Sequence, residues 1–334
     1  MKAVTGGALA LPLGRTIIQA IPANVYANPL KLGIIGLDTS HSTAFTKALN
    51  AKDAAATFHG HKVIAAYPKG SNDIESSIKR IEPYTEEVKK LDVKIVGSIQ
   101  ELLPLVDAVF LETNDGRLHL QQAREVIMAG KPLFIDKPMA ASLQDAIAIF
   151  ALAEQQKVPV FSSSSLRFMS SMQLVTQGKI GKVVGADTYS PAELEKTHPD
   201  FFWYGIHGVE LLYTAMGTGC VEVSRVSSKD TDIVVGTWAD GRIGTFRGTR
   251  SGKHDYGGTV YGEKGNQSLG PFDGYNALLL EIIKFFETGQ PPVAAADTLE
   301  IFAFMEAAGQ SKLRNGKPVT IESVMRKAKK YQNK

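Results

Sequence analysis

The sequence predicts an α/β protein with two domains: an N-terminal Rossmann-type, doubly wound parallel sheet, and a C-terminal α+β domain with a large, mostly antiparallel sheet. Three observations lead to this prediction. The length of 334 residues exceeds what one ordinary hydrophobic core accommodates. From Leu32 onward, short apolar runs alternate with segments of helical period, which is the pattern of βαβ units. After about residue 165, successive strand signals follow with few helices between them.

The first domain is expected to contain six parallel strands joined by helices. The strands are predicted at residues 31–37, 62–67, 94–97, 108–113, 132–135 and 158–162. Helices are predicted between them, for example over residues 118–129 and 143–156. Ser142 is placed to cap the start of the second of these helices, and Gly130 lies where the first should end.

The second domain is expected to consist of a sheet followed by closing helices. Its strands are predicted at residues 183–189, 222–226, 233–238, 242–250 and 258–261. Asp240-Gly241 is a strong hairpin signal between two of them. Helices are predicted over residues 278–287 and 297–311.

Composition excludes several classes of protein. Hydrophobic residues make up 44% and charged residues 21%, which is typical of globular enzymes and not of membrane or disordered chains. The net charge of +3 is small and dispersed, so no nucleic-acid surface is expected. The single cysteine, Cys220, excludes an internal disulfide framework and is expected to be a small buried hydrophobic residue.

The N-terminus is treated apart from the core. Residues 1–28 are predicted to be an export leader or a disordered arm, residues 29–164 the Rossmann-type dinucleotide-binding domain, and residues 165–334 the substrate and oligomerisation domain. The apolar stretch 3–14 follows Lys2 but is too short to span a bilayer. If residues 1–27 are a truncated leader, the protein is expected to be periplasmic or secreted, and otherwise cytoplasmic.

Four segments together resemble the Gfo/Idh/MocA family (glucose-fructose oxidoreductase, inositol dehydrogenase, MocA) over about residues 30 to 320. The most specific is the run Gly-Lys-Pro-Leu-Phe-Ile-Asp-Lys-Pro at residues 130–138. Supporting segments are Arg167-Phe168, Gly205-Ile206-His207 and Gly-Glu-Lys-Gly at residues 262–265. The resemblance implies a homo-oligomeric, NAD- or NADP-dependent oxidoreductase that acts on a secondary hydroxyl of a sugar, polyol or similar small molecule.

The resemblance also implies roles for individual residues. Lys137 directly follows a strand at the ligand-binding end of the parallel sheet, where burial is expected to lower its pKa toward neutrality, so it is the expected general acid or base. His207 is the second catalytic candidate. Related dehydrogenases carry an aspartate four residues before this histidine, whereas this chain has Trp203, so Tyr204 is expected to supply a hydroxyl there.

The phosphate-binding loop departs from the family pattern. The expected cofactor-binding residues are Gly36, Leu37, Asp38, Thr39, Ser40, His41, Lys69, Thr113, Asn114, His119 and Asp136. Asp38 stands where a glycine lets the backbone approach a diphosphate, and His41 where a glycine lets the helix pack close to the strand. Asp38 is expected to place negative charge near that diphosphate, to cap the following helix, or to be a ligand itself. Lys69 and Ser71 follow the second predicted strand. Either they bind the 2′-phosphate of NADP, which would favour NADP over NAD, or this segment is a plain solvent-exposed turn.

Substrate contacts are expected from Lys137, Arg167, His198, Trp203 and His207. No metal site is predicted, because His59-Gly60-His61 has no third ligand at usable spacing. Two alternative functions stay open. One is elimination or hydrolysis of a glycoside through transient NAD(P) redox. The other is a non-catalytic ligand-binding protein on a dehydrogenase scaffold, motivated by Asp38, His41 and Trp203.

Overall fold

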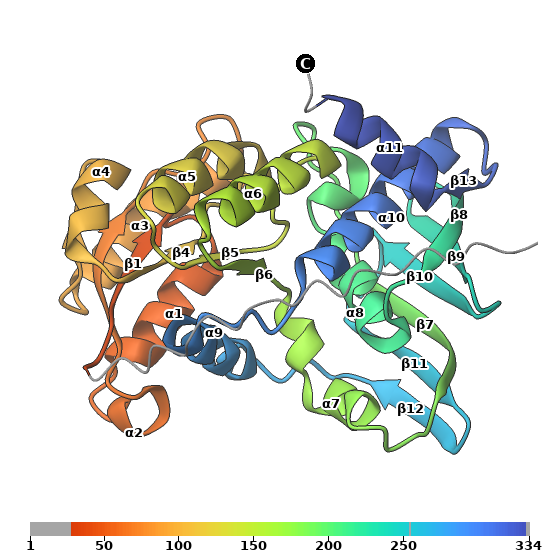
Figure 1. The fold of residues 1–334 in the computed structure, drawn as a ribbon, viewed down its shortest axis with the longest axis horizontal. Helices are drawn as coiled ribbons and strands as arrows, with labels where there is room; N and C mark the ends of the chain where they lie inside the picture. Colours follow the sequence, from red (N-terminus) through yellow and green to blue (C-terminus); the bar gives the residue numbers. More distant parts are fainter. Residues whose placement is uncertain (1–27, 254, 332–334) are drawn as a thin grey trace, which may run out of the picture.

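The computed structural model describes residues 28–253 and 255–331, and it contains two sheets side by side with helices around and between them (Figure 1). The first sheet is entirely parallel, with strand order β3-β2-β1-β4-β5-β6. Its strands are β1 (Lys31–Ile35), β2 (Lys62–Tyr67), β3 (Lys94–Ile95), β4 (Ala108–Leu111), β5 (Leu133–Ile135) and β6 (Val160–Ser162). All six predicted strands are therefore confirmed, with shorter ends at five of them.

Helices cover both faces of this sheet, as its buried apolar strands require. They are α1 (Ser40–Asn50), α2 (Ala55–Phe58), α3 (Glu75–Lys89), α4 (Ile99–Leu102), α5 (Gly116–Met128) and α6 (Leu143–Gln156). Ser142 caps α6 as predicted, because its hydroxyl accepts a hydrogen bond from the Asp145 backbone N–H at 3.0 Å. Gly130 follows the end of α5 with a φ of +71°, a conformation that favours glycine.

The sheet changes winding direction between β1 and β4, which lie next to each other although β2 and β3 intervene in the sequence. The loops that leave these two strands therefore diverge at the carboxyl edge. In open α/β sheets this divergence creates the crevice in which ligands bind. The fold thus places any ligand site beside the loops that follow β1 and β4.

The second sheet has seven strands in the order β12-β11-β7-β10-β9-β8-β13. They are β7 (Val183–Pro191), β8 (Cys220–Ser227), β9 (Thr231–Trp238), β10 (Ile243–Thr249), β11 (Gly257–Gly262), β12 (Gly265–Leu269) and β13 (Val319–Thr320). All neighbours pair antiparallel except β7 and β10, which are parallel. The predicted mostly antiparallel sheet is confirmed, including the turn at Gly241 (φ +86°) and the burial of Cys220, while β12 and β13 were not predicted.

Five helices accompany the second sheet in the chain: α7 (Ser170–Thr176), α8 (Ile206–Met216), α9 (Asn276–Thr288), α10 (Ala295–Leu313) and α11 (Ile321–Tyr331). α8 packs on β7 and β10, and α10 packs on β8. The resulting core includes Trp238, Phe246 and Phe304, each with 2% exposure or less. α8 thereby has a rigid support, and its first turn reaches the first domain.

α9 is separated in the sequence from the first sheet but packs against it, beside α1 (Figure 1). Its Phe285 ring lies edge-on to Phe161 with the centroids 4.7 Å apart, and Phe286 contacts Phe110 in the same way at 5.1 Å. Both phenylalanines of α9 are almost fully buried. The hydrophobic core of the first domain is therefore completed by a helix that comes late in the chain.

A buried arginine fixes the segment that precedes α8. Arg225 on β8 donates to Asp232 at 2.9 Å and to Asp200 at 2.7 Å, and its guanidinium lies 4.1 Å from the centre of the Phe201 ring. Arg225 is 1% exposed, and the two carboxylates offset the free-energy cost of burying its positive charge. The contacts hold the 3₁₀ turn Asp200–Phe202, which leads directly to Tyr204.

Within the described residues, no helix has the length and apolar character needed to cross a membrane. The leader or arm predicted at residues 1–27 lies outside the described residues.

Candidate functional site

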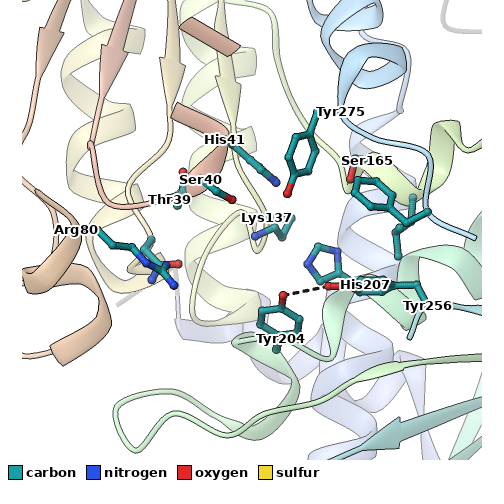
Figure 2. A pocket seen from close by; sticks show the side chains of 13 residues that line it. Thr39, Ser40, His41, Arg80, Lys137, Ser165, Tyr204, His207, Tyr256 and Tyr275 are labelled. Atoms are coloured by element: carbon teal, nitrogen blue, oxygen red, sulfur yellow. Dashed lines mark hydrogen bonds between the residues drawn. The ribbon is translucent and has the colours of Figure 1, made fainter. Parts of the chain in front are cut away.

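A cavity of about 140 Å³ lies at the carboxyl edge of the first sheet, where the second domain closes over it (Figure 2). The first domain contributes the start of α1, the loops after β4 and β5, and one side chain of α3. The second contributes the turn after β6, the segment that leads into the start of α8, the residue before β11 and the loop before α9. The lining residues are Thr39, Ser40, His41, Arg80, Asn114, Lys137, Ser165, Leu166, Tyr204, His207, Tyr256, Phe272 and Tyr275.

The structure brings seven of the predicted site residues together in this cavity: Thr39, Ser40, His41, Asn114, Lys137, Tyr204 and His207. Their arrangement follows from the topology, because the loops after β1, β4 and β5 emerge at the same edge of the sheet. The lining contains one lysine, one arginine and no carboxylate. A ligand in this cavity therefore meets positive charge.

Asp38 does not face the cavity, contrary to the expectation that it opposes a diphosphate. It is fully buried, and its carboxylate accepts hydrogen bonds from the Asn114 backbone N–H (3.0 Å) and from the Ser77 hydroxyl. Its predicted role as helix cap is also wrong, because Thr39 caps α1. Burial raises the pKa of Asp38. The aspartate thus braces the loops after β1 and β4 against α3.

Lys137 lies at the centre of the cavity, and its side chain is 13% exposed (Figure 2). Its Nζ is 3.6 Å from Asp136 Oδ2. Burial alone would lower the pKa of Lys137, but the nearby Asp136 carboxylate, with smaller contributions from Tyr204, Tyr275 and Glu112, raises it above the ordinary value of 10.5. The expected shift toward neutrality is therefore wrong, because Asp136 lies beneath the lysine. At neutral pH Lys137 is an ammonium group.

Glu112, at the end of β4, forms part of the same buried floor. It is fully buried, 4.0 Å from His41 Nδ1, and accepts a 3.5 Å hydrogen bond from the Thr39 hydroxyl. Burial and the nearby Asp136 raise its pKa well above the ordinary value, whereas the pKa of Asp136 is lowered because His41 and Lys137 offset its burial. Asp136 therefore carries the negative charge of this pair.

His207, in the first turn of α8, faces Lys137 from the second domain. Its Nδ1 lies 2.8 Å from the Ser164 hydroxyl. Burial, reinforced by the positive charge of Lys137, lowers the pKa of His207 well below 6.5, so the imidazole is neutral at pH 7. When Nδ1–H donates to Ser164, the other ring nitrogen has a free lone pair for a proton.

Tyr204 lies beside His207, with the ring centroids 5.2 Å apart. Its hydroxyl lies 3.0 Å from that of Tyr256, which the sequence did not single out (Figure 2). Burial raises the pKa of Tyr256, so its phenol keeps its proton at neutral pH. The pair offers hydroxyl groups to a ligand on the side of the cavity where Trp203 leaves no carboxylate.

Several predicted site residues do not line the cavity. His119 is buried with both ring nitrogens on backbone oxygens, those of Thr113 (2.7 Å) and Met139 (3.1 Å), so it joins two loops instead. Arg167 pairs with Glu210 at 2.9 Å. The others outside the lining are Gly36, Leu37, Asp38, Lys69, Thr113, Asp136, His198 and Trp203.

His198 and Trp203 instead form part of the contact between the domains. His198 Nε2 lies 3.3 Å from Asp115 at the start of α5, and its ring packs on Trp203 with the centroids 5.0 Å apart. Both histidine and aspartate are buried. His198 and Trp203 were predicted to contact the substrate. They instead hold the segment before α8 against the first domain.

Arg80 was missed by the sequence reasoning. It lies on α3, reaches the backbone oxygen of Asp38 at 3.4 Å, and directs its guanidinium into the cavity (Figure 2). In the part of the chain that the structure describes, no carboxylate pairs with it. An exposed helical arginine carries no sequence signal, because it joins the site only through the packing of α3 on the loop after β1.

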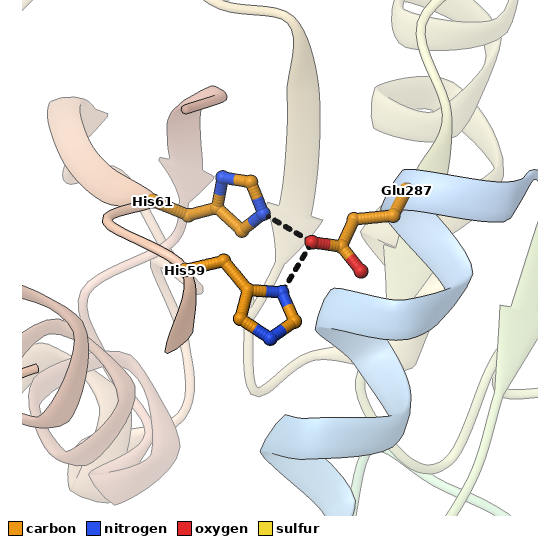
Figure 3. Close-up of side chains that lie close together, drawn as sticks. All are labelled: His59, His61 and Glu287. Carbon is orange, nitrogen blue, oxygen red and sulfur yellow. Dashed lines mark hydrogen bonds and ion pairs between the residues drawn. The ribbon is translucent and has the colours of Figure 1, made fainter. Parts of the chain in front are cut away.

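His59 and His61 have a third neighbour that their spacing did not reveal (Figure 3). Glu287, at the end of α9, lies 2.6 Å from His59 Nδ1 and 2.9 Å from His61 Nε2. The Leu30 backbone N–H donates to His61 Nδ1 at 2.7 Å, so the proton of the neutral ring is on Nε2 and donates to Glu287. His61 therefore has no lone pair directed at a metal, and the cluster attaches α9 to the first domain.

Comparison with known proteins gives a family match over the first domain. Residues 30–164 match the family model described as "Oxidoreductase family, NAD-binding Rossmann fold" (GFO_IDH_MocA). An uncharacterised oxidoreductase of Synechocystis is 33% identical over 93 residues, which cover 26% of this chain and 25% of that protein. The 1,5-anhydro-D-fructose reductase of Ensifer adhaerens is 31% identical over 102 residues, which cover 29% of this chain and 30% of that protein. These matches span a quarter to under a third of the relatives' length.

Solved structures match the fold over most of the chain. A probable dehydrogenase from Thermotoga maritima has a TM-score of 0.71 at 21% identity, covering 88% of this chain and 100% of that one. The scyllo-inositol dehydrogenase from Lactobacillus casei, solved with NAD(H) and scyllo-inositol, has a TM-score of 0.70 at 17% identity. The match covers 88% of this chain and 100% of that one. At these identities the likeness establishes the two-domain fold.

Proposed function

We propose, from the match of residues 30–164 to the Gfo/Idh/MocA oxidoreductase family model, that this protein is an NAD(P)-dependent oxidoreductase. Its substrate is a small molecule of the sugar or polyol class, oxidised or reduced at a secondary carbon. The observation that carries the proposal is the pairing of a cationic Lys137 with a neutral His207 across one cavity at the switch point of the sheet. The homo-oligomer implied by the family resemblance stays a prediction.

The residues around α1 fit a dinucleotide. Gly36 has a φ of +88°, and a Cβ there would lie 2.4 Å from the Thr113 backbone nitrogen, so the turn after β1 keeps the one glycine that the close approach requires. Thr39 and Ser40 present the start of α1 to the cavity, and Arg80 adds a positive charge beside them. These three residues would hold the diphosphate.

The proposed chemistry divides between the two central residues. The bound nicotinamide would accept the hydride from the hydroxyl-bearing carbon of the substrate, or return it in the reverse direction. His207, neutral at pH 7, accepts the hydroxyl proton during oxidation. The Lys137 ammonium donates a hydrogen bond to the same substrate oxygen and stabilises the negative charge that develops on it. Tyr204 and Tyr256 orient the remaining hydroxyls of the substrate.

The direct test is titration of the full chain with NAD, NADH, NADP and NADPH, followed by calorimetry, and then turnover assays with sugars and polyols. We expect the protein to bind NAD and NADH, or NADP and NADPH, and to turn the nucleotide over steadily. Bound nucleotide without net NADH release would favour glycoside elimination through transient redox. If none of the four binds to folded protein, the oxidoreductase proposal is wrong and a ligand-binding role is favoured.

Arg80 is expected to contribute directly to nucleotide affinity. Arg80→Gln removes a cation with no carboxylate partner among the described residues, so the dissociation constant for the preferred nucleotide should rise about tenfold, the effect of one charge-assisted hydrogen bond. Lys79→Gln is the matched control, because Lys79 is the preceding residue of α3 and pairs with Glu75 at the surface. Equal affinities of the two variants would remove Arg80 from the site.

The pH dependence of kcat/KM follows from the two shifted groups. His207 must be neutral to accept a proton, and its pKa lies well below 6.5, so kcat/KM should be flat from pH 6.5 upward and fall only at more acidic pH. Lys137 must be charged, and its raised pKa places the alkaline decline above pH 10.5. The profile is measured with the active substrate. A half-maximal rate between pH 6.5 and 8 would contradict this assignment of roles.

A further inference from the structure

The floor of the cavity contains a histidine, His41, that takes no part in the proposed proton or hydride transfer. His41 is in the first turn of α1, where the family pattern has glycine, and its side chain is only 6% exposed. Its ring lies edge-on to Tyr275 with the centroids 4.5 Å apart, and it also contacts Phe45 at 5.6 Å. These contacts fix the plane of the imidazole between the cavity and the core of the first domain.

Asp136 divides its two carboxylate oxygens between His41 and Lys137. Oδ1 lies 2.9 Å from His41 Nδ1, and Oδ2 lies 3.6 Å from Lys137 Nζ. Asp136 is fully buried directly after β5, and its Oδ2 has no hydrogen-bond partner among the described residues. Since the carboxylate is planar, the contact of Oδ1 with His41 determines the direction of Oδ2.

The distance between Asp136 and Lys137 is longer than that of a direct charge-assisted hydrogen bond, which is about 2.7–2.9 Å. The ammonium is therefore attracted by the carboxylate but keeps its hydrogens available for a ligand. We propose that His41 is a positioning residue: by holding Asp136 away from Lys137, it keeps the Lys137 ammonium directed into the cavity. The proposal rests on the proposed function, in which Lys137 contacts the substrate oxygen.

Without His41, Asp136 is free to turn both oxygens toward Lys137. The lysine would then form a closed ion pair at the floor and leave the cavity. The hydrogen bond of His41 goes to Asp136 and not to Glu112. Glu112 lies 4.0 Å from His41 Nδ1 and accepts the Thr39 hydroxyl instead. The ionisable groups that face Lys137 or the floor beneath it are His41, Glu112, Asp136, Tyr204, His207 and Tyr275.

The experiment measures Lys137 itself, in the full chain without nucleotide or substrate. The rate of acetylation of Lys137 by acetic anhydride is followed against pH by peptide mass spectrometry, with Lys131 as internal reference. His41→Phe keeps a ring against Tyr275 and Phe45 but removes the N–H group. The midpoint of Lys137 acetylation should rise by about one pH unit in this variant, because the closed ion pair favours the ammonium.

His41→Asn is the conservative variant, because its amide nitrogen occupies the position of Nδ1 and restores the hydrogen bond to Asp136. It should return the midpoint to that of the wild type. If His41→Phe fails to fold, His41→Ala removes the same N–H group and should give the same rise. An unchanged midpoint in the variant that folds would overturn the proposal. Failure of the oxidoreductase proposal is a separate result, seen as absent nucleotide binding in wild-type protein.

Discussion

Lys137→Met is expected to lower kcat/KM at least a hundredfold, on the order of the contribution of a positioned acid–base group, while leaving nucleotide binding nearly unchanged. Methionine keeps most of the lysine stem but removes the only lysine ammonium among the residues lining the cavity. Without it, the substrate oxygen would develop charge beside Tyr204 and His207 alone. The diphosphate contacts proposed for Thr39, Ser40 and Arg80 do not involve Lys137.

The measurement is steady-state turnover together with calorimetric titration of the preferred nucleotide. Lys131→Met is the matched control, because Lys131 is a partly buried lysine of the same segment that lies outside the cavity. It should retain wild-type turnover. Wild-type kcat/KM in Lys137→Met would show that the chemistry does not use this ammonium. Loss of nucleotide affinity as large as the loss of turnover would assign Lys137 to cofactor binding.

Arg225→Met is expected to lower the free energy of unfolding by about 3 kcal/mol, the lower end of the range for breaking a buried ion pair. Arg225 is 1% exposed and contacts both Asp200 and Asp232. The lower end applies because each aspartate keeps a second cation: Arg250 donates to Asp232, and Lys312 to Asp200 at 2.7 Å. The stability change is measured by urea unfolding of the full chain.

The control for this variant is Arg247→Met on the neighbouring part of the sheet. Arg247 is an exposed residue of β10, so its replacement should change the free energy of unfolding by less than about 0.5 kcal/mol. Arg225→Met should also raise KM, because the turn Asp200–Phe202 leads to Tyr204. Identical urea midpoints for the wild type and Arg225→Met would mean that the buried charges contribute no net stability.

The fold was predictable because its signals are local. Alternating apolar runs located all six strands of the first sheet, and Ser142 and Gly130 marked helix ends by capping chemistry that depends only on near neighbours. β13 was not predictable, because two residues in extended conformation have no period. Its pairing with β8 depends on a contact across almost a hundred residues.

The site was predictable where a residue directly follows a strand. Lys137 and Asn114 lie at the carboxyl edge because β5 and β4 end just before them. The protonation state of a residue was not predictable where it depends on neighbours that are far away in the sequence. Asp136 is the largest of several contributions that raise the pKa of Lys137 against burial, and its carboxylate is directed by His41 across 95 residues of sequence. Arg80 and Tyr256 likewise reach the cavity only through tertiary packing.

The position of α9 bears on how this protein can be divided or recombined. The first domain is not a contiguous stretch of the gene, since residues 276–288 fill part of its core and Glu287 attaches them to His59 and His61. A fragment that stops at residue 164 would leave the Phe110 and Phe161 contacts open to water. A chimaera built with another protein of this fold would therefore have to exchange this helix together with the N-terminal segment.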